Sequence, residues 1–297
     1  MNTTLWARIA ADITQTTGEV FTARREQSVG GGCINAAHVL EDDDRRYFVK
    51  LNDAARLDMF AAEAQGLEEI IRAKAIRAPA PVCYGTADDQ AYLVLEFIAL
   101  GHGGQASQEQ LGQQLAGLHR VTRPHYGWTR DNTIGATPQH NTECGDWVEF
   151  WRTQRLGFQL QLAAGKGYGG RLQTQGERLL MELPALLAGH SPPAALLHGD
   201  LWSGNYSVDA QGTPVIFDPA IYYGDRETDL AMTELFGGFS SRFYQAYNEA
   251  YPLPDGYRLR KSLYNLYHVL NHLNLFGGGY LAQAEQLLGG LLREVIP

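Results

Sequence analysis

The sequence is poor in cysteine and contains no long apolar run. Its three cysteines, Cys33, Cys83 and Cys144, form no CxxC pair, which argues against a disulfide framework and favours a reducing compartment. No run of about 18 apolar residues is present, so a transmembrane helix is not expected. The first residues also lack the basic segment and apolar stretch of a signal peptide. Together these absences predict a cytoplasmic protein without a membrane partner.

Positive charge is scarce as well. The chain carries 24 lysines and arginines against 33 acidic residues, a formal net charge of −9. Because no dense basic cluster is present, nucleic acid is not an expected partner, and polyanions would be repelled. This balance better suits a small neutral or cationic substrate. With 297 residues, 44% of them hydrophobic, the chain is long enough for one large domain or two medium ones.

The most informative stretch is His198-Gly199-Asp200, which is followed by Asn205. An Asn five residues after the Asp reproduces the spacing of the kinase catalytic loop, H-R-D-x-x-x-x-N. In that loop the Asp accepts the proton of the attacking hydroxyl and the Asn binds Mg²⁺. A second carboxylate, Asp218, follows a short apolar run that predicts a buried strand. Asp218 is therefore a candidate metal ligand, in the place of the Asp of D-F-G.

A glycine triplet lies nearer the N-terminus, between strands expected at 20–24 and 36–40. Gly31 and Gly32 could let backbone N–H groups approach phosphates closely. A glycine triplet is equally often a simple hairpin turn, and this one matches neither GxGxxG nor the Walker A pattern. The interpretation as a phosphate loop therefore depends on its surroundings.

A lysine and a glutamate follow the triplet in kinase-like order. Lys50 lies at the end of an apolar strand expected at 46–51, like the V-A-I-K lysine that pairs with the α/β-phosphates. Glu63 lies in the middle of a helix expected at 53–73 and is the candidate for the Lys–Glu ion pair of kinases. Taken alone, the lysine would be an exposed edge-strand residue, and the glutamate one of several solvated acids on its helix.

The next strands are expected at 82–85 and 91–98, and the second opens into a glycine-rich connector. In a kinase, the strand that leaves the small lobe leads into the hinge. We therefore expect backbone groups of Glu96, Phe97 and Ile98 to meet the adenine edge, and the lobe boundary to fall near residue 100.

Beyond that boundary, apolar periodicity predicts helices over 107–119, 147–164, 172–187 and 257–275. Ser107 is the expected N-cap of the first. The polar segment between Tyr126 and Trp151 is expected to form a long loop with exposed aromatics, and such loops are more often functional than idle.

Three polar residues of the C-terminal half have two interpretations each. His268 and His272 have the i, i+4 spacing of metal ligands, but the asparagines around them favour a polar face lining a groove over a zinc site. Asp229 begins another expected helix. It could accept backbone N–H groups from the catalytic loop or be a helix-start charge, and the two interpretations are even.

The order of these elements predicts an α+β, protein-kinase-like fold of two lobes. Each element is weak alone, but the glycine turn, strand lysine, helix glutamate, hinge strand, H-x-D…N and strand Asp follow one another as in kinases. The N-terminal lobe (1–99) would be a small antiparallel sheet with a helix. The C-terminal lobe (100–297) would be larger and mostly helical, with ATP between the two.

The sequence resembles the fructosamine (ketosamine) 3-kinase family, within the superfamily of aminoglycoside and choline kinases. The resemblance covers about residues 10–285, and the tract from Leu197 to Ala220 is its most specific part. The residues that carry it are Gly31-Gly32-Cys33-Ile34, 48–50, 131–135, 138–139, 146–147, 197–205, 216–220, 223–224, 236–239 and 271–274. One departure is 225–229, whose details differ from the family pattern although Asp229 keeps its place.

This resemblance implies transfer of the ATP γ-phosphoryl group to the C3 hydroxyl of a ketosamine, a fructosamine or ribulosamine adduct of an amine. The 3-phosphate is unstable and sheds the sugar, which deglycates the amine. Asp200 would be the base, and Asn205 and Asp218 would bind Mg²⁺. Lys50, fixed by Glu63, would support the phosphates together with the glycine loop.

The remaining candidates lie around this machinery. Trp202, Asp131, Asn132 and His272 are the candidate substrate residues, although Trp202 could instead be a packed loop aromatic. His198 and Asp229 are expected to support the catalytic loop. Cys33 is a candidate redox site, because oxidation of a thiol in the glycine loop could block nucleotide binding.

Three other functions stay open. An aminoglycoside- or choline-type kinase would share the ATP apparatus, but the tract 131–139 favours a ketosamine. A non-catalytic nucleotide-binding module is disfavoured because Lys50, Asp200, Asn205 and Asp218 are all present. A structural or interaction protein would have no reason to keep the base and both metal ligands. The sequence leaves open the sugar, the amine and the oligomeric state.

Overall fold

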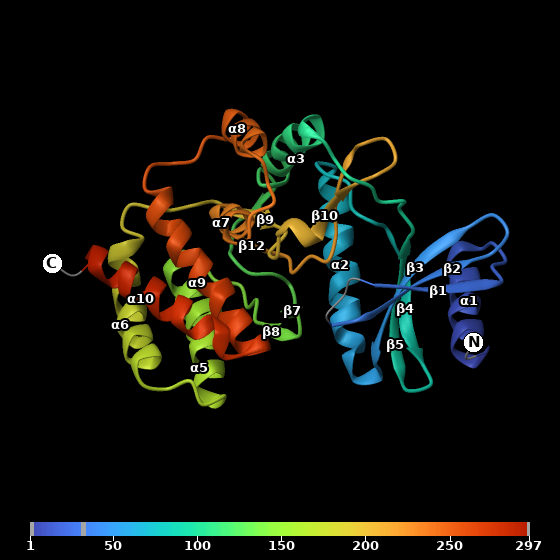
Figure 1. Cartoon of the computed structure of the whole chain (residues 1–297), viewed down its shortest axis with the longest axis horizontal. Helices are drawn as coiled ribbons and strands as arrows, with labels where there is room; N and C mark the ends of the chain where they lie inside the picture. Colours follow the sequence, from blue (N-terminus) through green and yellow to red (C-terminus); the bar gives the residue numbers. More distant parts are fainter. Residues whose placement is uncertain (1–2, 31–33, 296–297) are drawn as a thin grey trace.

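The computed structural model describes residues 3–30 and 34–295, and it shows a sheet-containing lobe beside a larger helical one (Figure 1). The N-terminal sheet has the strand order β1-β2-β3-β5-β4, and every neighbouring pair is antiparallel. This confirms the predicted two-lobe α+β architecture. The strands are β1 (Arg25–Val29), β2 (Ala36–Glu41), β3 (Arg46–Asp53), β4 (Pro81–Ala87) and β5 (Gln90–Glu96).

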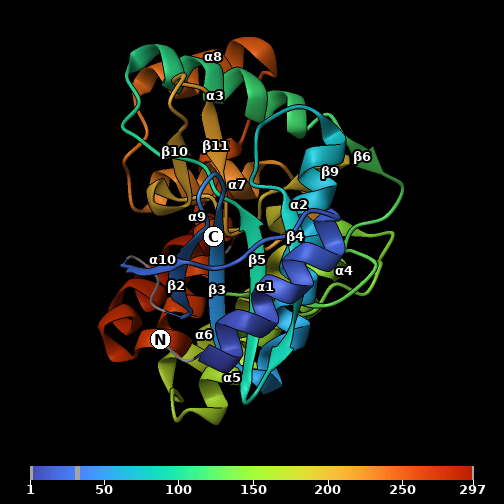
Figure 2. The same ribbon diagram turned by 90° about the vertical axis from the view of Figure 1, so that its right-hand side faces the viewer.

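Alternation along the strands directs side chains toward two different helices. Val49 and Leu51 of β3 share a core with α1 (Thr3–Thr17), which lies across this face of the sheet in Figure 2. Successive side chains of a strand point to opposite faces, so Lys50 between them faces α2 (Leu57–Ala73) and the helical lobe. The register of β3 thus places the lysine inside the molecule.

One predicted strand is wrong: the segment 20–24 is not a strand, and β1 begins after it. Phe21 is buried, packs edge-on against Tyr47 with ring centroids 5.0 Å apart, and donates its N–H to Thr14 Oγ1 at 2.9 Å. Its neighbour Val20 is 79% exposed. The segment is a link between α1 and the sheet, and its buried Phe21 serves packing rather than strand pairing.

The helical lobe contains the helices expected from the sequence, with small shifts at their ends. One difference concerns α3, where Ser107 is not the N-cap: Gly104 precedes the helix, and Ser107 Oγ donates to the Gly104 carbonyl at 2.8 Å. A π-helix, η2, joins α4 to α5. The helices are α3 (Gln105–Leu118), α4 (Trp147–Phe150), η2 (Trp151–Gly157), α5 (Phe158–Gly165), α6 (Arg171–Leu186), α7 (Glu227–Leu235), α8 (Ser241–Ala250), α9 (Tyr257–Phe276) and α10 (Leu281–Val295).

Short strands lie between these helices and the N-terminal lobe. Part of the expected loop between 126 and 151 is the β7–β8 hairpin, and Tyr126 and Trp128, expected to be exposed, are buried in the core of the helical lobe. The strands are β6 (Thr122–Arg123), β7 (Asn132–Ile134), β8 (Thr137–Gln139), β9 (Ala194–Leu197), β10 (Tyr206–Val208), β11 (Pro214–Ile216) and β12 (Tyr222–Gly224). They form the sheet β12-β9-β6 and the pairs β7–β8 and β10–β11.

The connection from β5 to α3 covers 97–104, and we propose the boundary between the lobes within it. Among the described residues, no helix combines the length and apolar character needed to cross a membrane.

The buried His268 of α9 is expected to make stability depend on pH. Its side chain is 3% exposed, and burial lowers its pKa to about 3. Below the ordinary histidine pKa of about 6.5, the unfolded chain binds a proton that the folded chain excludes. Stability therefore rises with pH between about 3 and 6.5 and is lost as the pH falls through this window. From pH 7.5 to 5, this histidine should lower the free energy of unfolding by about 2 kcal/mol.

Urea unfolding of the wild type and of His268→Gln at the two pH values measures this effect. The variant should lose about 2 kcal/mol less than the wild type over the same range, whatever its absolute stability. His102→Gln, at an exposed position, is the matched control and should behave as the wild type. Equal losses in all three proteins would show that His268 is not held neutral by the fold.

Candidate active site

A cavity of about 480 Å³ lies between the sheet and the helical lobe. Three of the predicted site residues, Asp131, His198 and Asp229, do not line it. Gly31, Gly32 and Cys33 lie outside the described residues, so the phosphate-loop and redox predictions remain predictions. The cavity brings together all the others: Lys50, Glu63, Glu96, Phe97, Ile98, Asn132, Asp200, Trp202, Asn205, Asp218 and His272.

Lys50 is held between two carboxylates in this cavity. Its ammonium donates to Glu63 Oε1 at 2.5 Å and to Asp218 Oδ1 at 2.6 Å, so the predicted Lys–Glu pair is present. Burial alone would lower the pKa of Lys50, but the carboxylates of Asp218 and Glu63 more than offset it and hold that pKa above its usual range. The lysine is charged, and two of its three N–H groups are engaged.

The loop after β9 turns sharply at Gly199. This residue has φ +83°, and an added Cβ would overlap the Ala220 carbonyl oxygen. Glycine accepts both the positive φ and the close approach, which explains why it stands where protein kinases have the Arg of H-R-D. The Ala220 N–H donates to the His198 carbonyl at 2.9 Å. The loop is thus tied to the chain that follows Asp218.

Asp229 of α7 supports this loop by accepting hydrogen bonds from its backbone. Its carboxylate accepts the backbone N–H groups of His198 at 2.7 Å and Gly199 at 2.8 Å, and the Nε2–H of His119 at 3.1 Å. Of the two interpretations of Asp229, the geometry supports the one in which it braces the loop. Burial would raise its pKa, but the donors from His119 and Gly199 hold that pKa below the usual range. His198 adds a bond from Nε2 to the Phe217 carbonyl at 2.9 Å.

Asp200 faces the cavity at the tip of the loop. Its backbone oxygen and its Oδ2 accept Asn205 Nδ2 at 2.9 Å and 3.3 Å. Burial, followed by the negative charges of Asp218 and Asp229, raises the pKa of Asp200 to about 7. A carboxylate whose pKa lies near neutrality is an efficient general base.

Asn205 and Asp218 both line the cavity, and the Phe217 N–H joins their segments by donating to the Asn205 carbonyl at 3.1 Å. Asn205 bonds Asp200 through Nδ2 and Asp218 bonds Lys50 through Oδ1, so within 3–30 and 34–295 no hydrogen bond engages Asn205 Oδ1 or Asp218 Oδ2. Asp218 adopts φ +57°, an uncommon conformation for a residue other than glycine. An amide oxygen beside a carboxylate oxygen suits a hard cation such as Mg²⁺. These residues fit a magnesium site.

At the hinge edge, one of the two backbone polar groups of Glu96 already has a protein partner. Its N–H donates to the Ala80 carbonyl at 2.8 Å, and its carboxylate pairs with Arg77 at 2.7 Å. The backbone N–H of Glu96 is therefore not available to a ligand. Phe97 and Ile98, which also line the cavity, remain candidates for contact with the adenine edge.

The β7–β8 hairpin lies at the end of the cavity remote from the hinge. Asn132 Nδ2 donates to the Ile221 carbonyl at 2.8 Å, and Gln139 Nε2 donates to the Ala220 carbonyl at 3.0 Å. These bonds fasten the hairpin to the segment that carries Asp218. Asn132 is thereby placed at the cavity wall.

Asp131 is the predicted substrate residue that the structure places elsewhere. Its carboxylate accepts the N–H of Asn141 and the Nδ1–H of His140, both at 2.8 Å. These donors, and not a cavity ligand, hold the pKa of Asp131 below its usual range against the effect of burial. Asp131 shapes the base of the hairpin and does not face the cavity.

Trp202 and His272 also line the cavity. The Trp202 ring covers the backbone of Gly204, because an added Cβ there would overlap the ring. His272 Nδ1 donates to the His268 carbonyl at 2.8 Å, which leaves Nε2 as an acceptor in the neutral ring. Burial lowers the pKa of His272 and so favours that neutral form.

The sequence matches the profile of the fructosamine kinase family over residues 5–294. A probable ketoamine kinase from Synechocystis sp. is 49% identical over 289 residues, which cover 97% of each chain. The chain belongs to the fructosamine kinase family. A chloroplastic protein-ribulosamine 3-kinase of Oryza sativa subsp. japonica is 41% identical over 281 residues, 94% of this chain and 82% of that one.

Solved structures agree with this membership in the fructosamine kinase family. The crystal structure of a proposed fructosamine-3-kinase from Haemophilus somnus 129PT has a TM-score of 0.90 at 29% identity, covering 97% of this chain and 98% of that one. The aminoglycoside phosphotransferase APH(4)-Ia shares the fold alone, with a TM-score of 0.62 at 14% identity over 96% of this chain and 98% of that one. The predicted protein-kinase-like fold is confirmed.

Arg155 is a feature of this fructosamine kinase family member that the sequence did not reveal. The side chain, 0% exposed, donates to the His140 carbonyl at 2.6 Å and to Asn141 Oδ1 at 2.8 Å. The rings of Tyr222 and Phe150 lie 4.0 Å and 4.6 Å from its guanidinium carbon. No carboxylate pairs with it in the described part of the chain. Arg155 ties the π-helix η2 to the segment after β8, and through it to the hairpin.

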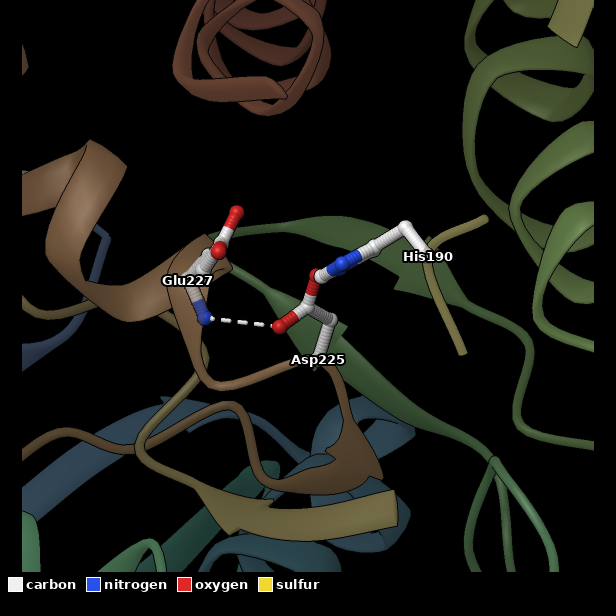
Figure 3. Close-up of side chains that lie close together, drawn as sticks. All are labelled: His190, Asp225 and Glu227. Atoms are coloured by element: carbon white, nitrogen blue, oxygen red, sulfur yellow. Dashed lines mark hydrogen bonds and ion pairs between the residues drawn. The ribbon is translucent and has the colours of Figure 1, made fainter. Parts of the chain in front are cut away.

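The departure from the family pattern at 225–229 forms a closed polar network. Asp225 Oδ2 accepts His190 Nε2 at 2.6 Å and the Tyr264 hydroxyl at 2.5 Å, while Glu227 forms a double ion pair with Arg260 at 2.7 Å and 2.8 Å. Figure 3 shows His190, Asp225 and Glu227 side by side, with potential ligand atoms within 4.8 Å of one another, and the Glu227 N–H donates to Asp225 Oδ1 at 3.0 Å. Because these atoms already have protein partners, the network supports the first turn of α7 and carries no metal proposal.

Proposed function

We propose that this protein is an ATP-dependent ketosamine 3-kinase, which phosphorylates the C3 hydroxyl of a fructosamine or ribulosamine adduct and thereby starts deglycation. The observation that carries the proposal is the convergence of Asp200, the Lys50–Glu63 pair and the oxygens of Asn205 and Asp218 in one cavity. Family membership supplies the acceptor class. The relatives' names include ketoamine kinase and protein-ribulosamine 3-kinase.

In this mechanism Asp200 acts as the base. Its carboxylate takes the proton of the C3 hydroxyl, and the oxygen forms a bond to the γ-phosphorus of ATP. The bond from the γ-phosphorus to the bridging oxygen breaks at the same time, and ADP leaves. The pKa of about 7 means that near neutral pH a substantial fraction of Asp200 is ionised and ready to take the proton.

The nucleotide would be bound by groups from both sides of the cavity. Asn205 and Asp218 would bind Mg²⁺, which neutralises charge on the phosphate oxygens when bound. Lys50 has an N–H for the phosphates, and Phe97 and Ile98 would meet the adenine edge. Because the reaction consumes ATP, we place it in the cytoplasm.

The acceptor binds at the hairpin end in this proposal. Asn132, Trp202 and His272 lie there within one cavity with Asp200. The lining elements of this end, 132–135, 202–204 and 271–276, contribute no acidic side chain to the described lining. This favours a ketosamine over a polycationic aminoglycoside, which would need several carboxylates.

A coupled ADP-release assay with a synthetic fructosylamine and a ribulosylamine tests the function. We expect turnover that depends on the ketosamine and on Mg²⁺, and release of free amine after phosphorylation. Kanamycin and choline serve as competing acceptors. Turnover of either of these without any turnover of ketosamines would overturn the proposal, and so would nucleotide binding without phosphorylation of any acceptor.

The Lys50–Glu63 pair gives a prediction of intermediate size. In Glu63→Gln the lysine loses one of its two carboxylates, and KM for ATP should rise about tenfold while KM for the ketosamine changes less than threefold. Glu68→Gln lies exposed on the same helix and is the matched control. Steady-state kinetics with each substrate varied in turn measure KM for ATP and KM for the ketosamine in both variants. Equal values of KM for ATP in both variants would contradict a role of Glu63 in the nucleotide site.

A further inference from the structure

Exposed apolar side chains gather at the acceptor end of the cavity. Nine large hydrophobic residues are exposed in the described part of the chain; of these, Ile34, Trp202 and Phe276 line the cavity, and Phe236 contacts the lining residue His272. With His272 these four residues are termed the acceptor mouth. Single exposed apolar residues need no explanation, but a group of them at the entrance of a site marks a binding surface.

Ring contacts join the aromatic part of the acceptor mouth. The ring centroid of His272 lies 4.9 Å from that of Phe236, 5.5 Å from that of Phe276 and 5.2 Å from that of Tyr280. The outer rings remain accessible, since Phe236 is 42% exposed and Phe276 is 56% exposed. His272 is thus the centre of an aromatic surface that continues from the cavity to the outside.

The apolar wall is completed from the N-terminal lobe. A Cβ built on Gly135, at the tip of the β7–β8 hairpin, would lie 3.1 Å from both Ile34 Cδ1 and Leu275 Cδ1. Ile34 and Leu275 therefore both reach the tip of the hairpin. The wall spans both lobes, so a group bound against it is contacted from two sides.

The part of the acceptor mouth that lines the cavity has no charged side chain among the described lining residues. The charged side chains of the described cavity lining are Lys50, Glu63, Glu96, Asp200 and Asp218. The first three lie on the sheet and α2, and the two aspartates belong to the phosphoryl-transfer centre. A carboxylate or a second ammonium placed at the acceptor mouth would lose water without gaining an ion pair, which is costly.

We propose that the acceptor mouth selects ketosamines whose amine nitrogen carries an uncharged apolar stem, alkyl or aryl, and disfavours those with a charge close to the nitrogen. The inference rests on the proposed function, because it assumes that the sugar is phosphorylated at Asp200. Trp202 lies nearest to Asp200 in sequence and faces the sugar, while Phe236 and Phe276 receive the stem. Such a stem can belong to a free amine or to a glycated side chain of a peptide.

Three fructosyl adducts that share one sugar test this selection: those of benzylamine, of the lysine side chain of a short acetylated peptide, and of glycine. At saturating ATP and Mg²⁺, kcat/KM for the benzylamine adduct should exceed that for the glycine adduct at least tenfold. Tenfold corresponds to about 55 Å² of apolar surface removed from water. If kcat/KM for the peptide adduct equals that for the benzylamine adduct, glycated side chains are a source of the substrate. If kcat/KM for the peptide adduct is much lower, the substrates are adducts of free amines. Equal values for benzylamine and glycine would overturn the proposal.

The double variant Phe236→Ser/Phe276→Ser isolates the surface. It should lose about tenfold in kcat/KM for the benzylamine adduct, while the value for the glycine adduct and KM for ATP stay within twofold. Tyr84→Ser, an exposed aromatic of β4 on the N-terminal lobe, is the matched control and should change nothing. Equal losses in kcat/KM for all adducts would show that the two rings have only a structural role. If the wild type turns over no adduct at all, the proposed function fails, and not only its stem selectivity.

Discussion

The Asp200→Asn variant is expected to bind ATP normally and to phosphorylate ketosamines about 10²–10⁴-fold more slowly, the usual contribution of a positioned general base. Asparagine has nearly the same shape and can keep the contact with Asn205, but it cannot take up the hydroxyl proton. The burial that raises the pKa of Asp200 to about 7 would also favour the neutral side chain in the variant. The fold should therefore be retained.

Single-turnover kinetics with saturating ATP measure the chemical step, and nucleotide titration by fluorescence measures binding. Asp255→Asn, at an exposed position before α9, controls for the loss of one negative charge and should match the wild type. A decrease in kcat of less than tenfold, with nucleotide affinity intact, would remove Asp200 from the role of base.

The Asp229→Asn variant is expected to lose both stability and activity. The carboxylate accepts two backbone N–H groups and His119 while 1% exposed. An amide keeps one oxygen but turns an NH₂ group toward a donor, so the free energy of unfolding should fall by about 3 kcal/mol. The loop that carries Asp200 would lose its support, and kcat should fall about 10²-fold, the cost of a displacement of about 1 Å.

Asp146→Asn provides a matched comparison for this prediction. Asp146 also accepts a backbone N–H, that of Glu149 at 2.7 Å, but it does so as the exposed N-cap of α4. Asparagine caps helices as well as aspartate does, so this variant should differ from the wild type by less than about 0.5 kcal/mol. Urea unfolding of the two variants, together with kcat, separates buried support from a simple capping bond. Similar stabilities would refute the role assigned to Asp229.

The parts of the site that the sequence predicted are those whose geometry is fixed locally. Asp200 and Asn205 lie on one loop, and Asp218 follows the β10–β11 pair that comes directly after this loop, so short connections hold the three residues close together. Lys50 and Glu63 belong to a strand and to the helix directly after it. Alternation along the strand then settles which face of the sheet the lysine occupies.

The parts that were missed depend on contacts between distant segments. An arginine in a helical stretch is ordinarily exposed, and nothing near Arg155 in sequence signals that the rings of Tyr222 and Phe150 enclose it. The polarity of Asp131 indicated a functional loop but not the direction of its carboxylate, which is set by Asn141. The residues around Phe21 have the composition of a strand, but Phe21 instead packs its segment against the N-terminal lobe.

Gly199 has a consequence for how such an enzyme can be regulated. Protein kinases order their activation loops when a phosphorylated residue pairs with arginines, and H-R-D places one arginine beside the catalytic base. Here that position adopts φ +83° against the Ala220 carbonyl and has no room for a side chain. A phosphorylated segment would find no cation there to dock on. The backbone conformation of Gly199 therefore excludes regulation by a phosphate group that binds at this point of the catalytic loop.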